Sequence, residues 1–101
     1  MQTVSRKRIE LLADAPLLPR LLAALEACEI GGHTIYHPTS GAGRTGRWSE
    51  DGLTGTSKLM LVAIASHDHA SAFVDQIAPL LDSHRLLLTL SVVEVVRGDR
   101  F

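Results

Sequence analysis

Residues 39–57 hold the side chains best suited to bind an anion. Gly41 and Gly43 stand beside Arg44 and Arg47 in this glycine-rich segment, for which we expect no regular secondary structure. Glycines let backbone N–H groups converge on an anion, and a guanidinium adds paired hydrogen bonds to phosphate or carboxylate oxygens. A segment of this length in a small domain is either functional or a charged connector. Composition alone leaves both interpretations open.

Two phosphate-binding motifs partly match this segment. Gly41 to Gly46 satisfies the pattern G-x-G-x-x-G, but that fingerprint requires a helix to open at its last glycine. Here the chain continues past Gly52 towards another apolar stretch. A P-loop requires Lys and then Ser or Thr after that glycine, whereas this chain has Arg47 and Trp48. Neither motif holds, and a glycine-rich cradle with two guanidinium groups remains.

The elements that must position this cradle follow from apolar periodicity. In chain order they are a strand at 3–12, a helix whose apolar stripe runs from Leu17 to Leu25, strands at 33–38 and 58–65, a helix whose apolar stripe runs from Phe73 to Leu81, and a strand at 86–96. This order predicts a single α+β domain over residues 1–101, a ferredoxin-like βαββαβ fold with an antiparallel sheet and both helices on one face. The other face keeps more apolar side chains than water-exposed strands need, so we expect oligomerisation through the sheet.

Polar residues and glycines mark the expected ends of the two helices. Asp14 precedes Pro16 and is the candidate cap of the first helix, as Asp68 is of the second. Gly31 and Gly32 follow the first apolar stripe and predict the end of that helix.

The charge and cysteine content limit the classes of partner. The formal net charge is −1 at pH 7, so we expect no binding to nucleic acid or to acidic membranes, and any anion site is local. Cys28 is the only cysteine, which excludes an internal disulfide and a cysteine-based zinc site. No apolar run is long enough for a signal peptide or a membrane span. We therefore expect a cytoplasmic protein.

The strands and the cradle together resemble a known family. Residues 32–35 (GHTI) and 40–44 (SGAGR) resemble the second strand and loop base of the P-II signal-transduction proteins. The likeness is closer to their PII-like relatives of the SbtB and carboxysome-associated branch. Residues 93–101 resemble the last strand of the family and its basic exit. The resemblance implies a homotrimer in which residues 39–57 form the T-loop, the long excursion that contacts a protein partner.

The resemblance also implies a signalling protein that binds an adenine nucleotide (ADP, AMP or ATP) between adjacent subunits, with no obligatory cofactor. The residues that match nucleotide-binding positions of the family are Thr34, Gly41, Ala42, Gly43, Arg44, Arg85, Arg97 and Arg100. Thr34 matches a position near the adenine or ribose, and the residues from Gly41 to Arg44 match the loop base around the phosphates. Arg85 stands where nitrogen-regulatory members carry a phosphate-binding lysine. Arg97 and Arg100 match basic positions after the last strand, which reach phosphates in relatives.

Bicarbonate as a second ligand and a bicarbonate transporter as a partner are further implications of the resemblance. His37, at the mouth of the loop, is the candidate bicarbonate contact, and Arg47 and Trp48 are candidates for ligand or partner contact. Trp48 either packs locally or anchors a partner. The loop has no tyrosine, since Tyr36 precedes it, so uridylylation of the loop is not expected.

Other chemistry has less support in the sequence. His67 and His69 suit borderline metals, as in the similar trimeric CutA proteins, but residues two apart at a helix start point in different directions, so we expect no metal site. No spacing of Ser, His, Asp or Cys indicates a nucleophile with its base, so we expect no catalytic residues and no enzyme. The alternative that remains is a small-molecule sensor of ACT or CutA type on the same fold. Its ligand binding would be indifferent to Arg44.

Overall fold

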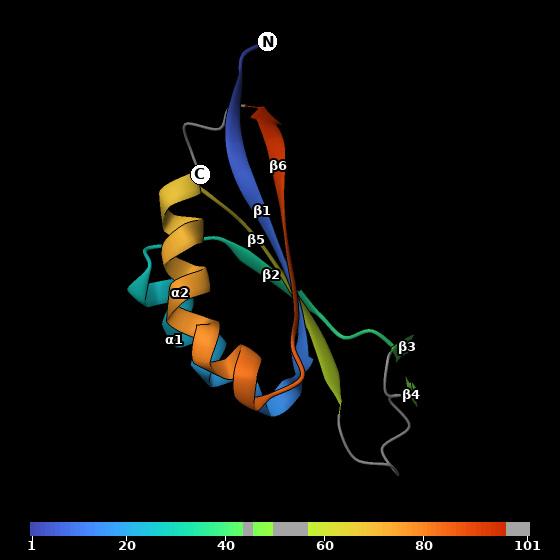
Figure 1. Ribbon diagram of the computed structural model, residues 1–101. Helices are drawn as coiled ribbons and strands as arrows, with labels where there is room; N and C mark the ends of the chain where they lie inside the picture. Colours follow the sequence, from blue (N-terminus) through green and yellow to red (C-terminus); the bar gives the residue numbers. More distant parts are fainter. Residues whose placement is uncertain (44–45, 50–56, 97–101) are drawn as a thin grey trace.

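Figure 1 shows the computed structural model of the chain, which describes residues 1–43, 46–49 and 57–96. Its elements are β1 (Thr3–Asp14), the short 3-10 helix η1 (Ala15–Leu17), α1 (Leu18–Ala27), β2 (His33–Tyr36), β3 (Ser40–Gly43), β4 (Gly46–Ser49), β5 (Lys58–Ala65), α2 (His67–Ser83) and β6 (Leu87–Val96). Four of the strands form one antiparallel sheet in the order β2-β5-β1-β6. Both helices lie on one side of this sheet (Figure 1). The predicted ferredoxin-like βαββαβ fold is confirmed.

The core lies between the sheet and the two helices. Along β1, Ile9, Leu11 and Ala13 are buried, whereas the intervening Glu10 is only partly buried. This alternation arises because successive strand residues point to opposite faces of the sheet. The helices add their own apolar stripes, and the largest buried side chains that they supply are Leu21, Leu25, Phe73 and Ile77. The apolar periodicity of the sequence therefore determines the buried face of β1 and of both helices.

Neither helix covers the opposite face of the sheet (Figure 1). Directly paired residues form an apolar row across all four strands at one end of this face: Tyr36, Met60, Leu12 and Leu87. Leu87 is 59% exposed, which is unusual for a large apolar side chain on a sheet with several apolar neighbours. This face has the apolar character that the sequence predicts for a contact between copies of the chain.

Helix α1 ends at Ala27, before the two glycines that were expected to end it. Glu29 adopts a left-handed φ of 59°. Its N–H donates to the Glu26 carbonyl at 3.0 Å, and the Ile30 N–H donates to the Leu25 carbonyl at 2.9 Å. This pair of bonds is a Schellman motif, in which glycine usually takes the left-handed position. The prediction was wrong because the hydrogen bonds of the last turn, and not the nearest glycine, decide where φ becomes positive.

Glycine in place of Glu29 should stabilise the protein. A side chain in the left-handed region is strained, and relief of this strain outweighs the extra freedom of glycine in the unfolded chain, for an expected gain of about 0.5–1 kcal/mol in the free energy of unfolding. Urea denaturation of Glu29→Gly measures the gain. Glu29→Ala removes the same carboxylate and keeps the Cβ atom, so it should give no gain. An equal gain from both variants would mean that backbone strain is not the cause.

The predicted caps of both helices are also corrected. Ser66 caps α2, since it is extended (φ −60°, ψ 159°) and its Oγ accepts the His69 N–H at 3.1 Å. Asp68 lies inside the first turn, where its charge complements the positive end of the helix dipole. Asp14 stands at the N-cap position of η1 with extended geometry (φ −71°, ψ 136°), but its side chain makes no capping bond. It lies opposite Lys58 in the strand register, and their Oδ1 and Nζ atoms pair at 2.7 Å.

Part of residues 39–57 is a β-hairpin, so the expectation of no regular structure was wrong there. Strands β3 and β4 pair in antiparallel fashion, with Gly41 opposite Trp48 and Ala42 opposite Arg47. They form a separate two-stranded sheet that stands away from the four-stranded sheet (Figure 1). Backbone pairing requires no apolar alternation, so the period-2 pattern of the sequence gives no sign of this hairpin.

Candidate functional site

The connections that carry the predicted binding residues leave from one end of the four-stranded sheet. The apolar row crosses all four strands there, where β1 and β2 end and where β5 and β6 begin. The β2–β5 connection contains residues 39–57, and the turn between α2 and β6 contains Arg85. Strand register therefore brings the glycine-rich segment and this arginine to the same end of the molecule.

Thr34 and Arg85 nevertheless lie on opposite edges of that sheet. Thr34 is exposed on β2, opposite Val62 of β5, and Arg85 is exposed just before β6. Two strands separate β2 from β6, and three spacings of about 4.8 Å place the edge strands about 14 Å apart. The strands of one copy do not bring these two predicted nucleotide-binding residues together.

The glycines of the cradle lie on β3. Gly41 is half-buried and Ala42 is exposed, and Gly43 is the last residue of the strand. Strand β4 includes the backbone of Arg47, which lies opposite Ala42, and of Trp48, which lies opposite Gly41. The side chains of Arg47 and Trp48 lie outside the description, so their proposed contacts stay predictions.

Three of the predicted phosphate-binding arginines lie outside the described residues. They are Arg44, Arg97 and Arg100. Arg85 is therefore the one predicted phosphate-binding arginine whose position the structure describes. The roles of all four stay predictions that experiments must test.

The base of the β2–β5 connection is held by contacts that were not predicted from the sequence. His37 Nδ1 lies 3.1 Å from the carbonyl oxygen of Lys58; because a carbonyl only accepts, Nδ1 donates and Nε2 is left for another contact. Lys58 Nζ pairs with Asp14 Oδ1 at 2.7 Å, and the Ala15 N–H donates to the Ser57 carbonyl at 2.8 Å. We call these three interactions the loop-base contacts. The sign of these contacts in the sequence was Lys58, a lysine at the start of an apolar strand that directly follows a long polar segment.

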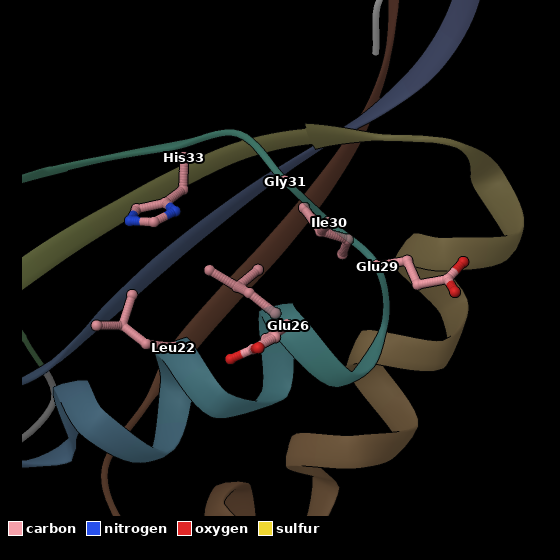
Figure 2. Close-up of a pocket in the computed structure, with 7 residues that line it drawn as sticks. Leu22, Glu26, Glu29, Ile30, Gly31 and His33 are labelled. Carbon is pink, nitrogen blue, oxygen red and sulfur yellow. The ribbon is translucent and has the colours of Figure 1, made fainter.

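A pocket of about 510 Å³ opens between α1 and the start of β2 (Figure 2). Its lining consists of Leu22, Leu25, Glu26, Glu29, Ile30, Gly31 and His33. Figure 2 shows the His33 ring pointing from β2 towards α1, and Glu29 turned away towards α2. His33 and Thr34 are successive strand residues, so their side chains point to opposite faces. Thr34 and this pocket therefore lie on different sides of β2.

The two histidines at the start of α2 contact different partners. His67 Nε2 lies 3.1 Å from Ser5 Oγ of β1, and His69 Nε2 lies 3.8 Å from Glu29 Oε2. Within the described ranges, no group of three His, Cys, Asp or Glu side chains is placed to hold a metal ion. No helix in that part of the chain has both the length and the apolar character needed to cross a bilayer.

The sheet order and the two helices on one face define an α+β protein of the ferredoxin-like class. A family model described as nitrogen regulatory protein P-II matches residues 6–100. The chain therefore belongs to the P-II family. No curated protein matches it.

Solved structures of PII-like proteins are similar over nearly the whole chain. CPII, a nitrogen regulatory PII-like protein from Thiomonas intermedia bound to ADP, AMP and bicarbonate, is 17% identical, with a TM-score of 0.89 over 99% of this chain and 96% of that chain. CPII bound to ADP, AMP and acetate is 16% identical, with a TM-score of 0.83 over 100% and 98%. A protein from Thermus thermophilus described as PII-like is 19% identical, with a TM-score of 0.82 over 100% and 99%. These likenesses confirm the PII-like fold, and the assignment to the SbtB branch stays a prediction.

Proposed function

We propose that this member of the P-II family binds adenine nucleotides and transmits the bound state to a protein partner. The observation that carries the proposal is the likeness to CPII over 99% of this chain, because CPII was solved with ADP and AMP bound. A TM-score of 0.89 supports the same arrangement of strands and helices in the two proteins. The proposed nucleotide site uses the β2 edge, the β2–β5 connection, the α2–β6 turn and the residues after β6.

A homotrimer supplies the second copy that the proposed site requires. The proposed contacts are Thr34 for the adenine or ribose, Gly41, Ala42, Gly43 and Arg44 at the loop base, and Arg85, Arg97 and Arg100 for the phosphates. Thr34 on β2 and Arg85 beside β6 lie on opposite edges of one sheet. A site that uses both residues therefore lies between copies of the chain. A cyclic assembly sets the β6 edge of one copy beside the β2 edge of the next.

A small carboxylate-like anion is the proposed second ligand. CPII was solved with bicarbonate and also with acetate, and both anions present a planar pair of oxygens to hydrogen-bond donors. We assign His37 and Arg47 as the contacts for bicarbonate. The loop-base contacts support the role of His37: because Nδ1 donates, Nε2 of the neutral ring is an acceptor, which suits the O–H of bicarbonate and leaves the anion's oxygens to the Arg47 guanidinium.

The signal in this proposal is a change of conformation in residues 39–57, the T-loop. A ligand shifts such an equilibrium only by its difference in affinity for the two loop states. The loop then fits or does not fit a partner such as a bicarbonate transporter, with Trp48 as the anchor. The role is regulatory rather than catalytic, it is carried out in the cytoplasm, and it involves neither nucleic acid nor insertion into a membrane.

Isothermal titration with ADP, AMP and ATP, each with and without bicarbonate, tests the proposal. Arg44→Ala combined with Arg97→Ala removes two charge-assisted contacts and should weaken nucleotide binding about 100-fold. Arg20→Ala, at an exposed position on α1, should leave binding unchanged. No binding by the wild type would refute the proposal. Undiminished binding by the double variant would favour a sensor of ACT or CutA type.

A further inference from the structure

The loop-base contacts tie both ends of the β2–β5 connection to the sheet. At its start, His37 Nδ1 donates to the Lys58 carbonyl oxygen at 3.1 Å. At its end, Lys58 lies directly opposite Asp14, and the Ala15 N–H donates to the Ser57 carbonyl at 2.8 Å. Lys58 therefore links the start of the connection, through its carbonyl, to the end of β1, through its ammonium group.

The ion pair between Lys58 and Asp14 is the best shielded of those in the described part of the chain. Its Nζ–Oδ1 distance is 2.7 Å, and its side chains are 16% and 28% exposed. The other two pairs described have side-chain exposures between 37% and 82%. A shielded pair is less weakened by salt and keeps its geometry better than an exposed one. The pair can therefore hold the two strand ends from which the segment departs.

We propose that Asp14 is a positioning residue for the ligand site at the base of residues 39–57, acting through Lys58 and not by touching the ligand. This inference rests on the proposed function. A bound ligand orders the residues that contact it, at a cost in conformational entropy, and a fixed base reduces that cost. Without the ion pair, the arrangement that binds the ligand is less populated, and the apparent affinity falls by the same fraction.

Asp14→Asn tests the proposal because it removes the charge and nearly keeps the shape. We expect ADP binding, measured by titration, to weaken about fivefold, which corresponds to about 1 kcal/mol. Amide hydrogen exchange within residues 38–57 should become faster. Asp75→Asn makes the same chemical change at an exposed position on α2 and should alter neither quantity. A merely structural role of Asp14 would lower the midpoint of thermal unfolding and leave the ADP affinity of the folded protein unchanged.

Reversal of the pair separates positioning from direct contact. Asp14→Lys combined with Lys58→Asp rebuilds the ion pair with opposite polarity, and it should return ADP affinity and exchange to within about twofold of wild type, because the coupling energy is recovered. Failure of this recovery, or wild-type affinity in Asp14→Asn, would overturn the proposal. If the wild type binds neither ADP, AMP nor ATP, the proposed function is wrong. Hydrogen exchange of residues 38–57 in Asp14→Asn and in the double variant then decides whether the ion pair positions this segment.

Discussion

Replacement of Phe73 by alanine should lower the free energy of unfolding by about 3–5 kcal/mol. Phe73 is 0% exposed, and it joins α2 to the core that α1 and the sheet complete. Alanine loses the transfer energy of the ring and leaves a cavity that the surrounding strands cannot fill. The free energy of unfolding of a domain is typically about 5–15 kcal/mol, so the substitution should remove a large part of it.

Urea denaturation at one fixed chain concentration measures the Phe73→Ala effect, because the proposed assembly would also contribute to stability. Val74→Ala is the matched control: it truncates the next residue of α2, which is only half-buried, and should cost about 1 kcal/mol or less. Phe73→Leu keeps much of the volume and should cost about 1.5 kcal/mol. A smaller loss in Phe73→Ala than in Val74→Ala would contradict the placement of the core.

Leu87→Asp should convert the proposed trimer into single chains of 10.9 kDa. Leu87 closes the apolar row on the face that neither helix covers, and it is 59% exposed in one copy. A carboxylate there costs the isolated chain little, but burial in an interface without a partner costs several kcal/mol per copy. Size-exclusion chromatography with light scattering measures the mass. Nucleotide binding should be lost together with the trimer, because the proposed site lies between copies.

Leu81→Asp is the control for the trimer experiment. Leu81 is also an exposed leucine, at 37%, but it lies on α2. This variant should keep the trimer and its nucleotide binding. A trimer that survives Leu87→Asp would show that the apolar row is not the contact, and a wild-type chain that is already monomeric would refute the proposed assembly.

The core strands were predictable because their apolar patterns are regular. The pattern over residues 58–65 predicts β5 with the bounds found, Lys58–Ala65, and the alternation from Lys7 to Leu11 assigns the buried face of β1 correctly. Burial acts on every second strand residue, so even a single sequence carries the signal. The helix stripe of Phe73 and Ile77 was visible for the same reason, with a period of 3.6 residues in place of 2.

The helix ends and the β3–β4 hairpin were not predictable from the residue types. Glu29 takes a left-handed position beside two available glycines, and Ser66 caps α2 ahead of the expected Asp68. In each case, several residues were able to satisfy the same backbone groups, and the geometry of the last or first turn selected one. The pairing of Gly41 with Trp48 depends on backbone bonds that leave no mark on the apolar pattern.

The sequence by itself determined the fold class, the buried faces of β1 and of both helices, and the glycine- and arginine-bearing segment that resembles the P-II family. Only the tertiary structure decided which residues meet. It set Thr34 and Arg85 on opposite edges of one sheet, and it paired Asp14 with Lys58, 44 positions away. The physical reason is strand register: side chains become neighbours through the pairing of distant strands, and that pairing depends on how the whole core packs.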